Sequence, residues 1–91
     1  MTRAELLDRL RREARDVYEW SNGPGDRYGE HSHAYTKILY CLEGSIDFMT
    51  RDGRIHLEAG DRLELPAGTT HSAAVGSAGV VCAEGKKKDL A

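Results

Sequence analysis

The sequence has few cysteines and no long apolar segment, so it lacks the features of a membrane protein or of a disulfide-rich secreted protein. Its 91 residues include two cysteines, Cys41 and Cys82, which are too few for a disulfide framework. No segment approaches the roughly 20 apolar residues of a membrane-spanning helix. Residues 1–16 are charged throughout and lack the apolar core of a signal peptide. We therefore expect a cytoplasmic protein with reduced thiols and no membrane partner.

The charge balance argues against a second class of partner. Thirteen basic and fifteen acidic residues give a net charge of -2. Because this balance provides no strongly basic face, we do not expect the protein to bind nucleic acid. The length supports one domain, whose hydrophobic core must be thin.

The N-terminal segment has the pattern of an amphipathic helix. Thr2 and Glu5 form a capping box, which satisfies two amides at the start of a helix. Apolar residues then recur at helical spacing in one stripe, which consists of Leu6, Leu7, Leu10, Ala14 and Val17. We expect a helix over residues 1–17, a single β domain over residues 18–85 and a solvated tail over residues 86–91.

The rest of the chain consists of short β-rich segments separated by turns, beginning with the turn-forming residues 21–25. Asp52-Gly53 is expected to form a two-residue hairpin turn. The expected strands are 36–43, 45–51, 54–58, 63–65, 71–75 and 80–84, the last two joined by a turn at 76–79. Turn signals about every 8 to 12 residues are typical of an all-β sandwich or a small barrel.

Three of the four histidines are spaced as metal ligands could be. His31 and His33 lie two residues apart, so in an extended strand both point to the same face. His71 lies far downstream, at the start of another expected strand. Three histidines that converge on one ion form a known site for a divalent transition metal with open positions. An H-x-H pattern alone is more typical of two exposed polar residues near a loop than of a metal site.

Two longer patterns contain these histidines and resemble the two motifs of the cupin superfamily. The first is Gly25-x5-His31-x-His33-x3-Lys37-x6-Gly44, with lysine where the family usually has glutamate. The second is Gly60-x5-Pro66-x-Gly68-x2-His71-x3-Val75, with valine where asparagine is usual. Together they extend over more than half of the chain. The resemblance implies a small antiparallel jelly-roll β-barrel, preceded here by an α-helix, with the two motifs facing each other across its interior.

The resemblance also implies a divalent metal bound by His31, His33 and His71, but the family's usual carboxylate ligand is replaced by Lys37. An inward ammonium about 5 Å from the ion would oppose binding by about 7 kcal/mol at an effective dielectric of about 20. Three outcomes would relieve the repulsion: deprotonation of Lys37, an ion pair with a carboxylate such as Glu30 or Glu43, or a metal-free pocket in which Lys37 binds an anion.

We expect the three histidines to hold the metal, which would be Zn²⁺, Ni²⁺, Fe²⁺, Mn²⁺ or Cu²⁺. Lys37 would then anchor a small anionic ligand or act as a general acid–base. His56 is expected on the surface. Cys41 is expected to be a buried cysteine rather than a metal ligand or a reactive thiol.

Alternation along the strand that contains Lys37 predicts the two faces of the barrel wall. Leu39 and Cys41 would share the inward face with Lys37. The outward face would be unusually apolar, since it carries Ile38, Tyr40 and Leu42. The N-terminal helix or a second copy of the chain should cover this face, and we expect a homodimer.

The residues and the resemblance leave three functions open. The first is a metal-dependent enzyme that acts on a small anionic metabolite. The second is a non-catalytic module that binds or senses a small ligand, with an empty or structural metal site. The third is a stress or storage protein with a structural metal. A fold hosts many chemistries, so the fold does not choose among them.

Overall fold

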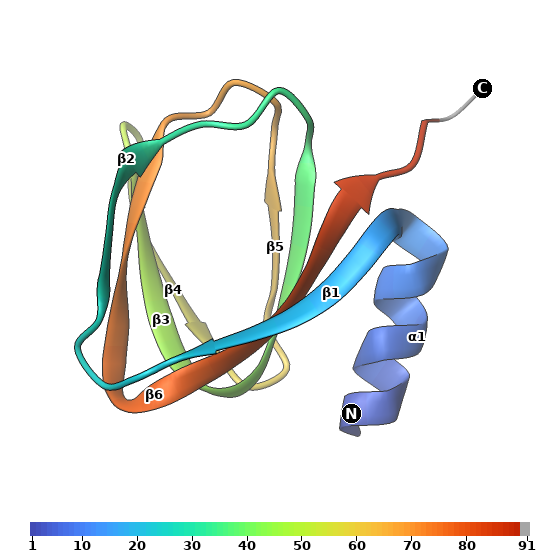
Figure 1. The fold of residues 1–91 in the computed structure, drawn as a ribbon, viewed down its shortest axis with the longest axis horizontal. Helices are drawn as coiled ribbons and strands as arrows, with labels where there is room; N and C mark the ends of the chain where they lie inside the picture. The colour runs from blue at the N-terminus through green and yellow to red at the C-terminus, as the bar shows by residue number, and fades with distance from the viewer. Residues whose placement is uncertain (90–91) are drawn as a thin grey trace.

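A computed structural model describes residues 1–89 as one helix followed by six strands (Figure 1). The helix α1 spans Arg3–Glu13. The strands are β1 (Ala14–Asn22), β2 (Arg27–His31), β3 (Lys37–Thr50), β4 (Gly53–Glu58), β5 (Arg62–Leu65) and β6 (His71–Lys87). Every strand pairing is antiparallel, as the sequence predicts.

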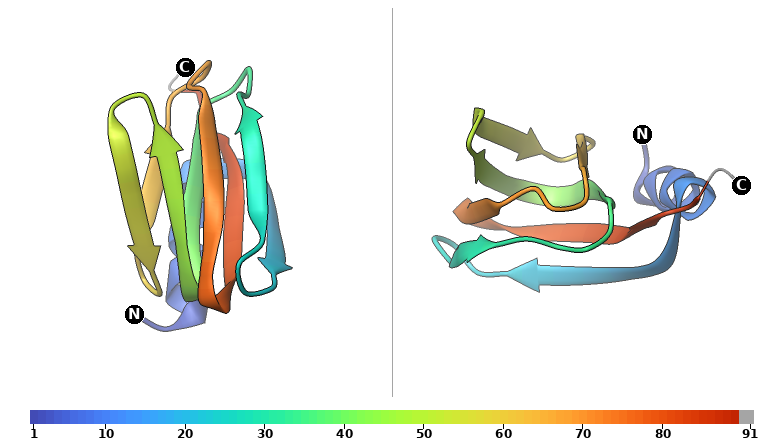
Figure 2. Two further views of the ribbon diagram at one scale, coloured as in Figure 1. Left: turned by 90° about the vertical axis from the view of Figure 1, so that its left-hand side faces the viewer. Right: turned by 90° about the horizontal axis from the view of Figure 1, so that it is seen from above.

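The pairing of β3 with β6 forms the centre of the sheet. The two long strands pair from Lys37 opposite Lys86 to Thr50 opposite His71, with one register shift between Cys41 and Glu43 and another between Gly44 and Ile46. β4 and β5 add to β3, and β1 and β2 add to β6. The resulting sheet curls around an interior, with α1 outside it (Figure 2). This is the expected jelly-roll arrangement.

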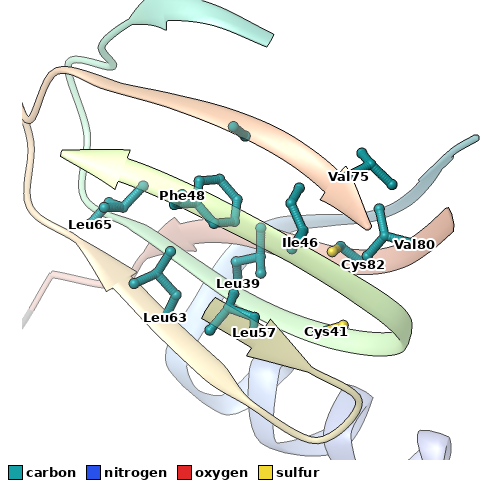
Figure 3. Close-up of a cluster of buried hydrophobic side chains, with 11 residues drawn as sticks. Leu39, Cys41, Ile46, Phe48, Leu57, Leu63, Leu65, Val75, Val80 and Cys82 are labelled. Atoms are coloured by element: carbon teal, nitrogen blue, oxygen red, sulfur yellow. The ribbon is translucent and has the colours of Figure 1, made fainter. Parts of the chain in front are cut away.

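Alternation along the strands divides the apolar residues into an inner and an outer cluster. The inner cluster fills the barrel and consists of Leu39, Cys41, Ile46, Phe48, Leu57, Leu63, Leu65, Ala73, Val75, Val80 and Cys82 (Figure 3). The outer cluster consists of Leu6, Leu10, Ala14, Ile38, Tyr40, Leu42 and Ala83. The predicted inward and outward residues of β3 are therefore confirmed. Successive side chains of a strand point to opposite faces, so β3 serves both clusters.

The helix covers the apolar outer face that the sequence predicts. Leu6 and Leu10 of α1 are buried there against Ile38 and its neighbours. The tyrosine in this cluster, Tyr40, donates a hydrogen bond to Glu13 at the end of the helix (2.6 Å). Since the helix already covers this face, the homodimer remains a prediction from the sequence. Within residues 1–89, the helix α1 is too short and too polar to cross a membrane.

The helix is shorter than expected, because the chain turns into β1 after Glu13. The capping box is confirmed, with Thr2 and Glu5 bonded to each other's amides. Ala14 and Val17 still pack with the helix, which explains why they continue its stripe in the sequence. Pairing with β6 extends the backbone here, and such tertiary contacts override a helical propensity.

Several strand boundaries also differ from those expected. The two segments expected around Gly44 form one bent strand, β3, and those around residues 76–79 form β6. Thr50 pairs with Gly53, so the hairpin turn lies at residues 51–52, one residue earlier than expected. The expected tail begins later, because β6 continues to Lys87. Residues 90 and 91 of that tail lie outside the described part of the chain.

The bend in β3 depends on Gly44, and its replacement tests the fold. Gly44 has a φ of 73°, and a Cβ there would lie 2.0 Å from the carbonyl oxygen of Gly79. We predict that Gly44→Ala lowers the free energy of unfolding by about 2–4 kcal/mol, because the left-handed backbone and the clash add. Gly29→Ala is the matched control, because nothing lies within 4 Å of its Cβ position. Equal stabilities of the two variants in urea denaturation would contradict the prediction.

Candidate metal centre

The three histidines expected to bind metal lie together at one end of the barrel interior. His31, the last residue of β2, pairs directly with His71, the first residue of β6. His33 follows two residues after β2 and packs against both rings, with ring centroids 5.1 Å from His31 and 5.4 Å from His71. The His31 and His71 centroids are 4.3 Å apart. The potential ligand atoms all lie within 4.8 Å of one another.

Backbone carbonyls orient two of the rings. His31 Nδ1 lies 2.8 Å from the carbonyl oxygen of Gly29, and His71 Nδ1 lies 2.9 Å from that of Thr69. A carbonyl oxygen only accepts, so each Nδ1 carries the proton and donates it. In the neutral ring the other nitrogen, Nε2, then has a free lone pair. A carbonyl that fixes the tautomer in this way is typical of histidines that bind metals.

The donor set fits a divalent transition metal. The Nε2 atoms of His33 and His71 are buried and have no hydrogen-bond partner among residues 1–89. Buried polar atoms are nearly always satisfied, so two such atoms beside a third imidazole indicate a missing ligand between the rings. Neutral imidazoles bind Zn²⁺, Ni²⁺, Fe²⁺ and Cu²⁺ without a carboxylate.

Burial and nearby positive charge favour the neutral form of these rings. Burial is the largest cause that lowers the pKa of His33, followed by the positive charge of Lys37. Burial also lowers the pKa of His71, although the bond to Thr69 opposes that change. A histidine must be neutral to bind a metal, so both effects favour the form of His33 and His71 that binds a metal.

Lys37 points into the barrel, as expected, but its ion-pair partner is neither Glu30 nor Glu43. Its ammonium lies 3.2 Å from the carboxylate of Glu84, a residue of β6. Both residues are buried, with exposed fractions of 7% for Lys37 and 3% for Glu84. Glu84 also accepts a hydrogen bond from the indole of Trp20 at 2.7 Å. The lysine charge is therefore compensated inside the protein.

A cavity of about 310 Å³ connects this ion pair with the histidines. Its polar side contains His31, His33, Lys37 and Glu84. Its apolar walls are formed by Tyr18, Trp20, Tyr28, Ile46, Phe48 and Ala73. The volume is near the lower end of the range for ligand sites in proteins. The cavity is therefore suited to a small molecule with a polar end and a flat or apolar body.

The sequence predicts His31, His33 and Lys37 of this cavity as site residues but not the others, among them Tyr18, Trp20 and Glu84. Tyr18 and Trp20 lie on β1, which was not expected to be a strand. Burial and the negative charge of Glu84 raise the pKa of Tyr18 to about 12, so its hydroxyl stays protonated. Glu84 itself could have been found, because it follows Cys82 by two residues in an expected strand and therefore shares its inward face.

The other candidates lie outside the histidine cluster. His56 is exposed on β4, and hydrogen bonds to Asp47 and Glu58 raise its pKa. Cys41 lies opposite Cys82 in the sheet and is fully buried, as expected. Among the described residues, the cluster of potential metal ligands contains neither of these side chains.

Comparisons with known proteins agree with this geometry. The family model described as "Cupin domain" matches residues 18–83. Over 54 residues, 57% of this chain, the sequence is 48% identical to quercetin 2,3-dioxygenase of Bacillus subtilis (strain 168). Over 49 residues, 48% of this chain, it is 49% identical to acireductone dioxygenase 4 of Oryza sativa subsp. japonica. These matches span 16% and 27% of those two proteins.

The solved structures support the same fold. A protein of unknown function from Rhizobium leguminosarum bv. viciae 3841 superposes with a TM-score of 0.73 and 18% sequence identity. The match covers 80% of this chain and 69% of that one. At this identity, the likeness concerns the fold alone.

The burial of both cysteines predicts that they do not react in the folded protein. A hydrogen bond with Cys41, together with burial, raises the pKa of the Cys82 thiol, and thiols react as thiolates. We predict that a chromogenic disulfide reagent modifies less than about 0.1 thiol per folded chain in an hour, because both sulfur atoms are inaccessible. After denaturation it should modify both. Rapid modification of the native protein would contradict the prediction, because it would show that the reagent reaches at least one of the two thiols.

Proposed function

The chain belongs to the cupin family, and from this premise we propose that it binds one divalent transition metal through His31, His33 and His71. The observation that carries the proposal is the pair of buried Nε2 atoms of His33 and His71, which have no partner within residues 1–89. A metal between the three rings would satisfy both atoms. Imidazole ligands favour Zn²⁺, Ni²⁺, Fe²⁺ or Cu²⁺ over Mn²⁺.

The proposed ligand of this centre is a small anionic molecule. Three neutral imidazoles bring no negative charge, and the charges of Lys37 and Glu84 cancel, so a bound ion would attract an anionic oxygen donor. The apolar cavity walls would pack against the rest of the molecule. An ammonium has three N–H donors, so Lys37 can bond to Glu84 and still donate to the ligand.

Catalysis is one form of this proposal. Two relatives are named quercetin 2,3-dioxygenase and acireductone dioxygenase 4, which supports an oxygen-dependent reaction of a small molecule. A bound metal would supply Lewis-acid or oxygen-activating chemistry. Lys37 would hold the ligand's anionic group or transfer a proton at Nζ. Trp20 and Phe48 would exclude water from the apolar part of the cavity.

The alternative is a non-catalytic module that binds or senses the same ligand. The match covers 16% and 27% of the two dioxygenases, so their names do not decide between the two forms. Oxygen uptake by the Fe²⁺-loaded protein with a panel of small acids and thiols would distinguish the two forms. The homodimer and the cytoplasmic location stay predictions from the sequence, and light scattering at micromolar concentration would test the first.

Metal analysis tests the proposal directly. We predict that protein supplied with Zn²⁺ or Ni²⁺ and passed through a desalting column retains about one equivalent of metal, because three imidazoles form a complete ligand set. His71→Ala should retain less than about a tenth of an equivalent, since two ligands remain. His31→Ala, at an exposed position, should show the same loss without disturbing the core.

The matched control is His56→Ala, which removes an exposed histidine outside the cluster and should keep the full equivalent. Circular dichroism of each variant would establish that it is folded. Wild-type protein with less than a tenth of an equivalent, or metal retained by both His31→Ala and His71→Ala, would contradict the proposal.

A further inference from the structure

The buried ion pair beside the histidines has no role in holding a metal directly. Within residues 1–89, the cluster of potential ligands comprises the three histidines and does not include Glu84. Glu84 is instead held by two donors, the ammonium of Lys37 and the indole N–H of Trp20, at 3.2 Å and 2.7 Å. Its direct Cα partners are Leu39 on β3 and Tyr18 on β1. The carboxylate therefore sits between two neighbouring strands, fixed on both sides.

The positive charge of Lys37 would repel any cation bound by the histidines. Its side chain lines the same cavity as His31 and His33. Because Lys37 is 7% exposed, water screens its charge poorly. An unpaired lysine at this position would repel a divalent ion strongly.

The carboxylate of Glu84, from a different strand, compensates the positive charge of Lys37. Lys37 and Glu84 lie diagonally across the β3–β6 pairing, where side chains of this length can meet. Removing one partner of such a buried pair leaves an uncompensated charge, whereas removing both leaves none. The effect of Glu84 on the metal should therefore depend entirely on whether Lys37 is present.

We propose that Glu84 is a positioning residue required for metal binding, because its carboxylate neutralises Lys37 and not because it contacts the ion. This inference rests on the proposed function, since it concerns the affinity of the three-histidine centre. It assigns Trp20 a supporting part, because the indole N–H donates to Oε1 of the carboxylate while Lys37 faces Oε2. The family's usual glutamate is thus replaced by a neutral pair of opposite charges.

A double-mutant cycle tests the inference, with the dissociation constant for Zn²⁺ measured by competition with a chromophoric chelator at constant pH and ionic strength. Glu84→Gln keeps the shape and the acceptor for Trp20 but removes the charge, and should weaken binding by at least about 30-fold. Lys37→Met should bind at least as tightly as the wild type. The double variant, Lys37→Met with Glu84→Gln, should return to within about threefold of the wild type, because no unpaired charge remains.

Two outcomes would overturn the inference while leaving the metal site in place. Glu84→Gln that binds Zn²⁺ within threefold of the wild type would show that the charge is irrelevant. A folded double variant as weak as Glu84→Gln would show that Glu84 acts as a ligand or through structure alone. Wild-type protein that binds no Zn²⁺ is a different result, because it overturns the proposed function and this inference with it.

Two further variants serve as controls. The first tests the loss of a carboxylate elsewhere on the protein, and the second replaces Glu84→Gln if that variant does not fold. Glu43→Gln removes an exposed carboxylate paired with Arg3 and should leave the dissociation constant within about twofold, because solvent screens that charge. The swapped pair, Lys37→Glu with Glu84→Lys, keeps the cavity neutral and should still bind Zn²⁺. If Glu84→Gln does not fold, a folded swapped variant that has lost the metal overturns the inference.

Discussion

The long antiparallel pairing of β3 with β6 is the constraint on which the rest of the structure depends. Its register sets Thr50 opposite His71 at one end and Leu39 opposite Glu84 towards the other. The other four strands attach to these two, and the bend near Gly44 lets one pair of strands serve both sides of the barrel. Pairing of β2 with β6 then brings His31 to His71. The candidate metal centre is thus assembled by backbone register.

Electrostatics explain how a lysine is accommodated where a carboxylate would ordinarily help to bind a cation. Burial lowers the pKa of His33 and of His71, while backbone carbonyls accept the Nδ1 protons of His31 and His71 and so leave Nε2 for a ligand. Lys37 is paired with Glu84, so the protein contributes no net charge to the cavity. A bound metal would then be the dominant local charge, which favours an anionic ligand in the adjoining cavity.

Much of this architecture could be predicted from the sequence, because it depends on short-range patterns. Alternation along β3 predicted that Leu39 faces inward and Tyr40 outward, and the resemblance to the two cupin motifs implied that the three histidines meet. The strand β1 was missed, because charged residues such as Arg15 and Glu19 hide its alternation and only pairing with β6 makes it a strand. The partner of Lys37 was missed because it depends on the register of β3 against β6, which brings together two residues 47 positions apart in the sequence, Lys37 and Glu84 (84 − 37 = 47).

X-ray absorption spectroscopy of the Zn²⁺-loaded protein tests the central claim most directly, because it counts and identifies the atoms bound to the metal. The account predicts three imidazole nitrogens at about 2.0–2.1 Å, with the remaining positions filled by light atoms from solvent or ligand. Sulfur at about 2.3 Å, or a first shell with fewer than three imidazoles, would contradict it.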